Sequence, residues 1–134
     1  MKINKLPIIL AITALVISTL ACGGSLSTAN IGDAWLSNDG EGNNRMTTFS
    51  QEDTMNLFVE LNNAPDDTEI KVTWIAVDAE GVDPNYLLNE TNFTSSDDVV
   101  HFDLSNDNLW PVGSYKVDVY LNGTLDRSLT FEVQ

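Results

Sequence analysis

The residues suited to covalent chemistry are few: this chain of 134 residues holds one cysteine, Cys22, and one histidine, His101. A thiol nucleophile needs a base within hydrogen-bond reach, and His101 lies far along the chain from Cys22. We therefore expect no catalytic pair, and we place His101 on the surface of a strand. One histidine and one cysteine also fall short of the ligand sets that zinc sites use.

Oxygen ligands occur at alternate positions in the segment NDGEGNN, residues 38–44, as Asp39, Glu41 and Asn43. Calcium prefers oxygen ligands, and alternate spacing in a loop lets several point inward. An EF-hand loop would also need a glutamate at its twelfth position and helical flanks, and the segment has neither. We interpret it as a solvated turn, with calcium binding as the alternative, and we predict no other metal and no cofactor.

The first 21 residues have the layout of a secretory signal. Lys2 and Lys5 make a basic start, Leu6–Leu20 is largely apolar, and small residues surround its end. The apolar core is shorter than the roughly 20 residues that a spanning helix needs.

The end of this segment, Thr19-Leu20-Ala21-Cys22, resembles the lipobox of bacterial lipoproteins. The resemblance implies that diacylglycerol is attached to the Cys22 thiol and that the chain is cut before Cys22. It departs from the family pattern at Thr19, where the family most often has leucine. The alternative is an ordinary secretory signal with an incidental cysteine. We expect a signal peptide over 1–21, a lipidated tether over 22–29 and one folded domain over 30–134.

The charge of the chain restricts its partners. The leader holds two of the six basic residues and none of the twenty acidic ones, so residues 22–134 carry a net charge of −16. Such a surface repels nucleic acid and anionic lipid head groups. Attachment to a membrane would therefore depend on acyl chains. With a single cysteine the domain has no internal disulfide, and burial of apolar surface must stabilise it.

From Ile31 onward, apolar residues alternate with polar ones, and turn residues interrupt the pattern about every ten positions. This pattern predicts an all-β fold, an antiparallel β-sandwich of about seven strands after the signal peptide. We expect strands over 30–36, 47–50, 54–62, 69–78, 86–89, 99–105, 114–121 and 125–133.

The last two expected strands should form a hairpin. A two-residue turn at 122–123 in regular register would turn Asp126 and the alternate polar residues after it into the core. A three-residue turn avoids this, so we predict a type I turn with Gly123 left-handed and a G1 bulge. This register places Asp118 opposite Asp126 and puts Arg127 on the inward face, with its guanidinium in water.

Two aromatic residues carry a resemblance to a known fold: Trp74, within IKVTWIAV, and Tyr115, within PVGSYKVDVYLNG. The chain resembles the immunoglobulin-like β-sandwich, in its disulfide-free versions common in bacterial surface proteins and small lipoproteins. The resemblance implies that Trp74 anchors the core and that the Tyr115 hydroxyl bonds back across a tyrosine corner. These motifs specify the fold rather than an activity.

One face of the two central strands should carry an apolar strip flanked by charges. Such a strip is either a surface for a partner or a site of packing under an edge strand or the 79–96 segment. The residues concerned are Thr73, Ile75, Val77, Lys116 and Tyr120.

The sequence therefore predicts a lipid-anchored, extracytoplasmic protein of the cell envelope that binds and displays rather than catalyses. Its expected partners are the membrane, through Cys22, and another protein, with nucleic acid excluded by charge. The alternatives are a structural or accessory subunit of an envelope complex, and a small hydrolase or protease inhibitor.

Overall fold

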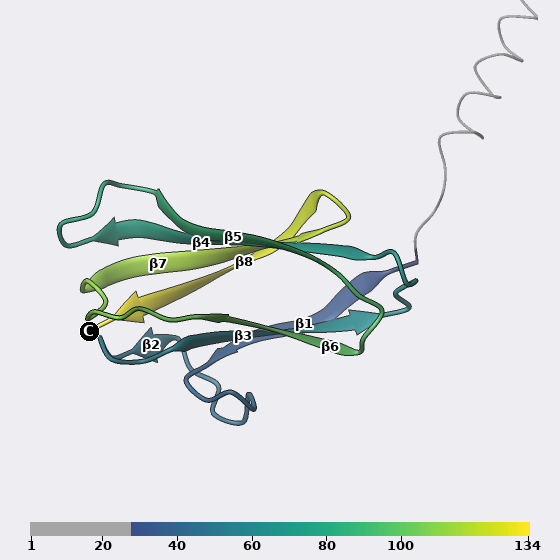
Figure 1. The fold of residues 1–134 in the computed structure, drawn as a ribbon, viewed down its shortest axis with the longest axis horizontal. Helices are drawn as coiled ribbons and strands as arrows, with labels where there is room; N and C mark the ends of the chain where they lie inside the picture. Colours follow the sequence, from purple (N-terminus) through teal and green to yellow (C-terminus); the bar gives the residue numbers. More distant parts are fainter. Residues whose placement is uncertain (1–27) are drawn as a thin grey trace, which may run out of the picture.

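The computed structural model describes residues 28–134 of the chain. The predicted signal peptide over 1–21 and the predicted lipidation at Cys22 lie outside the described residues. Within them, eight strands form two facing sheets, as the alternation predicted (Figure 1). No helix between residues 28 and 134 is long and apolar enough to cross a membrane.

The smaller sheet has three antiparallel strands in the order β1-β3-β6. They are β1 (Asn30–Ser37), β3 (Met55–Asn62) and β6 (Val99–Leu104). β1 and β6 are therefore its two edges.

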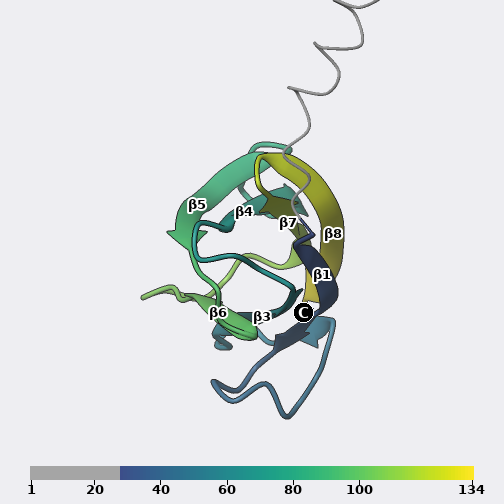
Figure 2. The same cartoon turned by 90° about the vertical axis from the view of Figure 1, so that its right-hand side faces the viewer.

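The larger sheet has five strands in the order β2-β8-β7-β4-β5, and it arches over the smaller one (Figure 2). Its strands are β2 (Thr48–Phe49), β4 (Glu69–Ala79), β5 (Tyr86–Thr94), β7 (Gly113–Leu121) and β8 (Thr124–Val133). Only β2 pairs in parallel, with β8. The smaller sheet ends at β6, so no further strand of that sheet lies opposite the edge strand β5 of the wider sheet.

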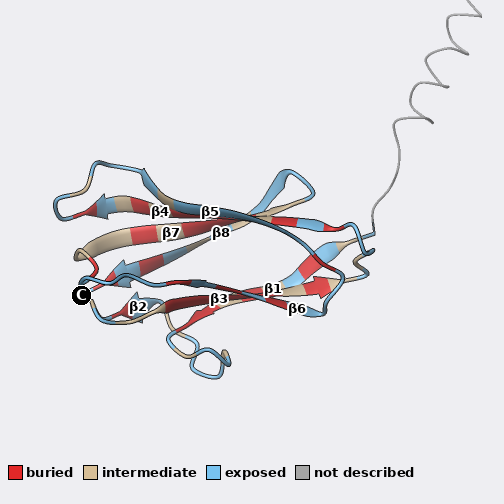
Figure 3. Cartoon of the chain, in the orientation of Figure 1, coloured by how far each residue is buried: buried red, intermediate tan, exposed pale blue. Residues whose placement is uncertain are grey.

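The core lies between the sheets because alternate side chains of each strand point to the same face. Trp74 is buried there, with the Phe131 ring edge-on at 6.1 Å, and Tyr115 stacks on Phe131 at 5.4 Å. Buried residues occur along the strands of both sheets (Figure 3). Other side chains of β3 and β4 in this core are at most 3% exposed: Met55, Leu57, Val59, Leu61, Ile70, Val72 and Ala76.

The corner before β7 is held by Tyr115. Its hydroxyl donates to the Pro111 carbonyl oxygen at 2.5 Å, which is the hydrogen bond expected of a tyrosine corner. Burial raises the pKa of the Tyr115 hydroxyl, so it stays protonated and remains a donor. Gly113 lets the two strands approach closely here, since a Cβ at this position would lie 2.2 Å from the Asp78 carbonyl oxygen.

The β7–β8 hairpin corrects the predicted turn. Leu121 pairs with Thr124, so the loop has two residues, and both have positive φ, 48° at Asn122 and 84° at Gly123. This is the geometry of a type I′ turn, and the predicted three-residue type I turn is wrong.

A β-bulge reconciles this short turn with the buried positions. Tyr120 pairs with Leu125 but Val119 pairs with Arg127, so Asp126 is the extra residue of β8. The shift restores the inward alternation of β8 after the turn. It also places Asp118 opposite Ser128, so the predicted opposition of Asp118 and Asp126 is wrong.

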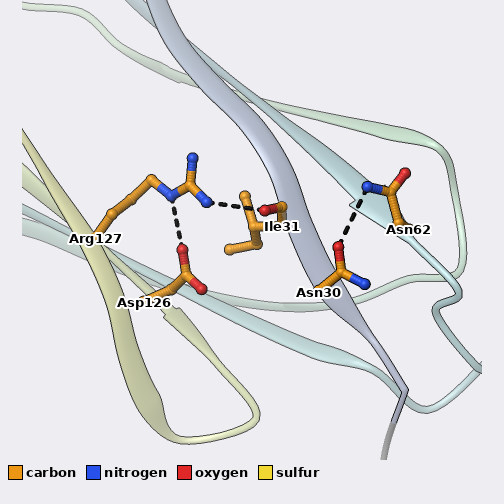
Figure 4. Close-up of polar contacts among 5 residues, drawn as sticks. All are labelled: Asn30, Ile31, Asn62, Asp126 and Arg127. Carbon is orange, nitrogen blue, oxygen red and sulfur yellow. Dashed lines mark hydrogen bonds and ion pairs between the residues drawn. The ribbon is translucent and has the colours of Figure 1, made fainter.

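Arg127 follows the bulge and links the two sheets. Its position opposite Val119 puts it on the inward face, as predicted, but its guanidinium is not left to water. One Nη donates to the Ile31 carbonyl oxygen at 2.8 Å, and Nε donates to Asp126 at 2.6 Å (Figure 4). Beside it, the side chains of Asn62 and Asn30 bond at 3.3 Å. These contacts fix the start of β1.

Candidate functional site

Of the five residues predicted to share one surface, all but Val77 lie on the outer face of β4 and β7: Thr73, Ile75, Lys116 and Tyr120. Cross-strand pairing places Ile75 beside Lys116 and Thr73 beside Asp118, while Tyr120 lies opposite Lys71. We call this surface the outer face.

Val77 fits the outer face less well. It is the extra residue of a bulge in β4, between Ala76 and Asp78, and is partly buried. Its carbonyl oxygen accepts a hydrogen bond from the Asn85 amide. It therefore lies at the margin of the outer face.

The outer face has two apolar rows that the sequence did not fully reveal. Ile75 pairs with Leu87 on β5, and Tyr120 pairs with Leu125 on β8. Leu87 is 51% exposed and Leu125 is 50% exposed. Their membership depends on the register of β5 and on the bulge in β8, so only the pairing pattern could have identified them.

A polar row separates the two apolar rows. Thr73 pairs with Asp118, which accepts a hydrogen bond from the Ser128 hydroxyl at 2.5 Å. Thr73 and Asp118 are buried although they lie on the outer face, and Thr73 Oγ1 has no hydrogen-bond partner. Buried hydroxyls normally have a hydrogen-bond partner, so the polar row is the part of the outer face with an unpaired hydrogen-bonding group.

The lysines of the outer face have their charges offset locally. Lys71 Nζ lies 4.2 Å from the centre of the Tyr120 ring and 3.7 Å from Glu90. Lys116 Nζ lies 3.5 Å from Asp118. The methylene stems of both lysines can therefore cover apolar surface while their charges stay paired.

The opposite sheet carries a stack of aromatic rings on its outside. Phe58 stacks on Trp35 at 5.5 Å and on His101 at 4.5 Å, and the Arg45 guanidinium lies 4.1 Å above the Trp35 ring. His101 is exposed on its strand, as expected. Its Nε2 lies 2.8 Å from the Asn56 amide oxygen, which holds the ring in place but is neither a nucleophile nor an acid.

The loop over residues 38–44, the alternative calcium site, is organised by Asp39. One carboxylate oxygen accepts from the amides of Glu41 at 2.9 Å and Asn43 at 3.1 Å, and the other accepts from Asn44 at 2.9 Å. Desolvation acts to raise the pKa of Asp39, but these backbone hydrogen bonds outweigh it and hold the pKa below its ordinary value.

The other two calcium candidates bond to each other, because Asn43 Nδ2 donates to Glu41 Oε2 at 3.2 Å. The hydrogen bonds of this loop therefore close it without a cation. Across residues 28–134, no three side chains of His, Cys, Asp or Glu are grouped to hold a metal ion.

Two cavities open at the sides of the sandwich. One, of about 340 Å³, lies between β1 and β8 near Trp35 and Met46. The other, of about 320 Å³, lies between β5 and β6 and is lined by Phe93, Phe102 and Asp103 among others. Both are at the lower end of the range of small-molecule sites.

Solved structures share this fold. An immunoglobulin-like protein from Pseudomonas aeruginosa superposes with a TM-score of 0.55 at 11% sequence identity, covering 83% of this chain and 100% of that one. The PmoD soluble domain from Methylocystis sp. gives 0.52 at 12% identity, with coverages of 83% and 100%. No protein-family model and no curated protein matches the chain.

A β-glucosidase from Listeria innocua also contains the fold, with a TM-score of 0.53 at 19% identity. The match covers 82% of this chain but only 16% of the enzyme chain. At such identities these similarities show an immunoglobulin-like sandwich and carry no activity across to this protein.

Proposed function

We propose that this protein is a lipid-anchored, extracytoplasmic binding module that acts by display and not by catalysis. In this account Cys22 carries the acyl chains, residues 22–29 are the tether, and residues 30–134 are the presented domain. An eight-residue tether reaches at most about 28 Å, so the sandwich would stand close to the membrane. The strand β1 begins at Asn30, which leaves this tether short.

The observation that carries the proposal is the pair of apolar rows on the outer face. Exposed apolar rows bounded by charged side chains are typical of surfaces that bind proteins. The rows are flanked by Lys71 and Lys116, both lysines of the presented domain, and each is paired with a carboxylate. The charge of each lysine is therefore balanced beside the rows, by Glu90 for Lys71 and by Asp118 for Lys116.

A permanently assembled accessory subunit of an envelope complex is the second candidate. The half-exposed Leu87 and Leu125 favour it, because a permanent interface would cover them. A module that binds reversibly should purify as a stable monomer, whereas an accessory subunit should be recovered only within a large assembly. Turnover of a substrate by the wild-type protein that is lost in His101→Ala would instead indicate an enzyme.

Photo-crosslinking in the native membrane tests the proposal. A photoreactive residue at Ile75 should give a discrete crosslinked product that Tyr120→Ala weakens about tenfold, the loss expected when a central interface tyrosine is truncated. Thr48→Ala, at an exposed position of the edge strand β2 outside the rows, should leave the product unchanged. A photoreactive residue in the exposed loop at Glu52 is the control for random contacts, and identical products from both positions would contradict the proposal.

A further inference from the structure

The open side of the sandwich lies between β5 and β6, which are edge strands of opposite sheets and lie on the same side in Figure 2. The cavity of about 320 Å³ fills the space between them. Its walls come from both strands, with Trp74 of β4 contributing from the core side. A fourth strand added beside β6 would lie along this cavity.

The backbone of β6 is prepared for such a strand. At its start, the Leu61 amide donates to the Asp98 carbonyl oxygen at 2.7 Å. In an antiparallel pair, hydrogen-bonded residues alternate with residues whose N–H and C=O groups point away from the neighbour. Val99, His101 and Asp103 therefore direct their N–H and C=O groups to the free side.

The side chains around this edge alternate in character. Phe93 is 46% exposed and meets Phe102 edge-on at 6.3 Å, so the inner wall is aromatic. Val100, Phe102 and Leu104 face the core, whereas Val99 and Asp103 face outward. An added strand would thus meet apolar surface with every second side chain.

The rim of the cavity is acidic. Asp97 and Asp103 line the cavity, and Asp98 belongs to the loop that joins β5 to β6. The four basic side chains of residues 28–134 form their ion pairs elsewhere, with Asp33, Glu90, Asp118 and Asp126. The carboxylates of the rim therefore have no cationic partner within the described part of the chain.

We propose that the free edge of β6 binds an extended, cationic segment of another protein, which adds as a fourth strand to the three-stranded sheet. Its apolar side chains enter the cavity against Phe93 and Phe102, and its lysines or arginines, on the alternate residues, pair with Asp103 and the neighbouring aspartates. Strand addition of this kind draws its affinity from the main chain and its specificity from alternate side chains.

Charge complementarity selects this occupant over a second copy of the chain. Two β6 edges pairing antiparallel would bring Asp103 of one copy toward Asp97 and Asp98 of the other. Like charges placed opposite each other across strands are unfavourable. The acidic rim therefore opposes self-pairing, as charged edge residues commonly do, while it favours a basic strand.

Peptide binding to the full-length protein tests the proposal. The probe is an eight-residue peptide of alternating valine and lysine, capped at both ends, and its binding is measured by fluorescence anisotropy. A peptide with glutamate in place of lysine is the charge control. The lysine peptide should bind at least about tenfold more tightly than the glutamate peptide, because like charges across an interface cost several kcal/mol.

Proline substitutions separate strand addition from general attraction of charge. Val99→Pro removes an N–H group that points to the free side and should weaken the lysine peptide about tenfold, whereas Val99→Ala keeps that N–H and should bind within about threefold of wild type. Asn92→Pro is the matched control on β5. The Ser95 amide donates to the Thr68 carbonyl oxygen, and the same alternation points the Asn92 N–H to the free edge of β5.

Equal weakening by Val99→Pro and Asn92→Pro would overturn the proposal, as would equal affinity for the two peptides. If Val99→Pro does not fold, N-methylation of the lysine peptide replaces it. Methylation of alternate residues in one phase should abolish binding and in the other phase preserve it, and an equal effect of both phases would overturn the proposal. This site is separate from the outer face, so Ile75→Asp should leave peptide binding intact.

Discussion

At the scale of single residues, the hydrogen bonds that a side chain makes show which of its possible roles it has in this fold. Asp39, Glu41 and Asn43 have the alternate spacing of calcium ligands, but the Asp39 carboxylate accepts three backbone N–H groups. An aspartate side chain that accepts backbone N–H groups can organise a turn without a cation. The residue types that do this are the same ones that bind calcium. Spacing alone therefore could not separate a cation site from a hydrogen-bonded turn.

The Asp39 loop should lose order as pH falls. Since the pKa of Asp39 is lowered in the folded chain, its contribution to stability is present above the pKa of an unfolded aspartate and is lost as pH drops through the folded value. Asp39→Asn keeps one acceptor oxygen and should free the Asn44 amide, which hydrogen exchange can measure. The difference in exchange between Asp39→Asn and wild type should shrink at acid pH, and a difference that grew there would contradict this assignment.

At the scale of elements, the alternation of buried side chains was enough to locate most strands. It predicted a strand over 54–62, one residue longer than the observed β3 (Met55–Asn62), because every second residue from Met55 to Leu61 is apolar. It bounded β5 too short, at 86–89 instead of Tyr86–Thr94, because an exposed edge strand has no buried face to impose a pattern. The one-residue bulge at Asp126 leaves no signal in composition, which is why the hairpin was predicted with the wrong turn.

Gly113 is the element-scale position with the least tolerance. An added Cβ would lie 2.2 Å from the Asp78 carbonyl oxygen and 2.5 Å from the Ala79 Cα, so backbone would have to move. Gly113→Ala should therefore lower the free energy of unfolding by about 2 to 3 kcal/mol in a denaturant titration. Gly40→Ala meets nothing within 4 Å and is the matched control. Equal stability of the two variants would show that β4 and β7 can separate here without cost.

At the scale of the whole molecule, the candidate surfaces follow from topology, which the sequence could not supply. The face that holds Ile75 and Tyr120 was predictable from alternation, but Leu87 and Leu125 joined it only through strand pairing. The cavity between β5 and β6 exists because one sheet has five strands and the other has three. The number of strands in each sheet is set by long-range pairing and not by local pattern.

The net charge predicts how salt affects stability. After residue 21, twenty carboxylates outnumber four basic groups, so the excess carboxylates repel one another at neutral pH. Raising NaCl from about 10 mM to about 150 mM shortens the Debye length from about 30 Å to about 8 Å, so the melting temperature should rise. Relief of about 1 kcal/mol would raise it by about 4 °C, measurable by thermal unfolding.

Potassium chloride should reproduce the effect of sodium chloride, because screening does not depend on the ion. A much larger rise with calcium chloride at equal ionic strength would instead indicate a specific divalent site. A fall in melting temperature with salt would show that ion pairs such as Lys116 with Asp118 outweigh the repulsion.

The central claim is that the sandwich is presented at a membrane through Cys22. The direct measurement is incorporation of a labelled fatty acid into the full-length chain in its native host, compared with Cys22→Ser. We predict that the wild-type chain carries the label and fractionates with membranes, while Cys22→Ser carries none and is released. Absence of label from the wild type, or equal labelling of Cys22→Ser, would contradict the anchor and with it the proposed display at a membrane.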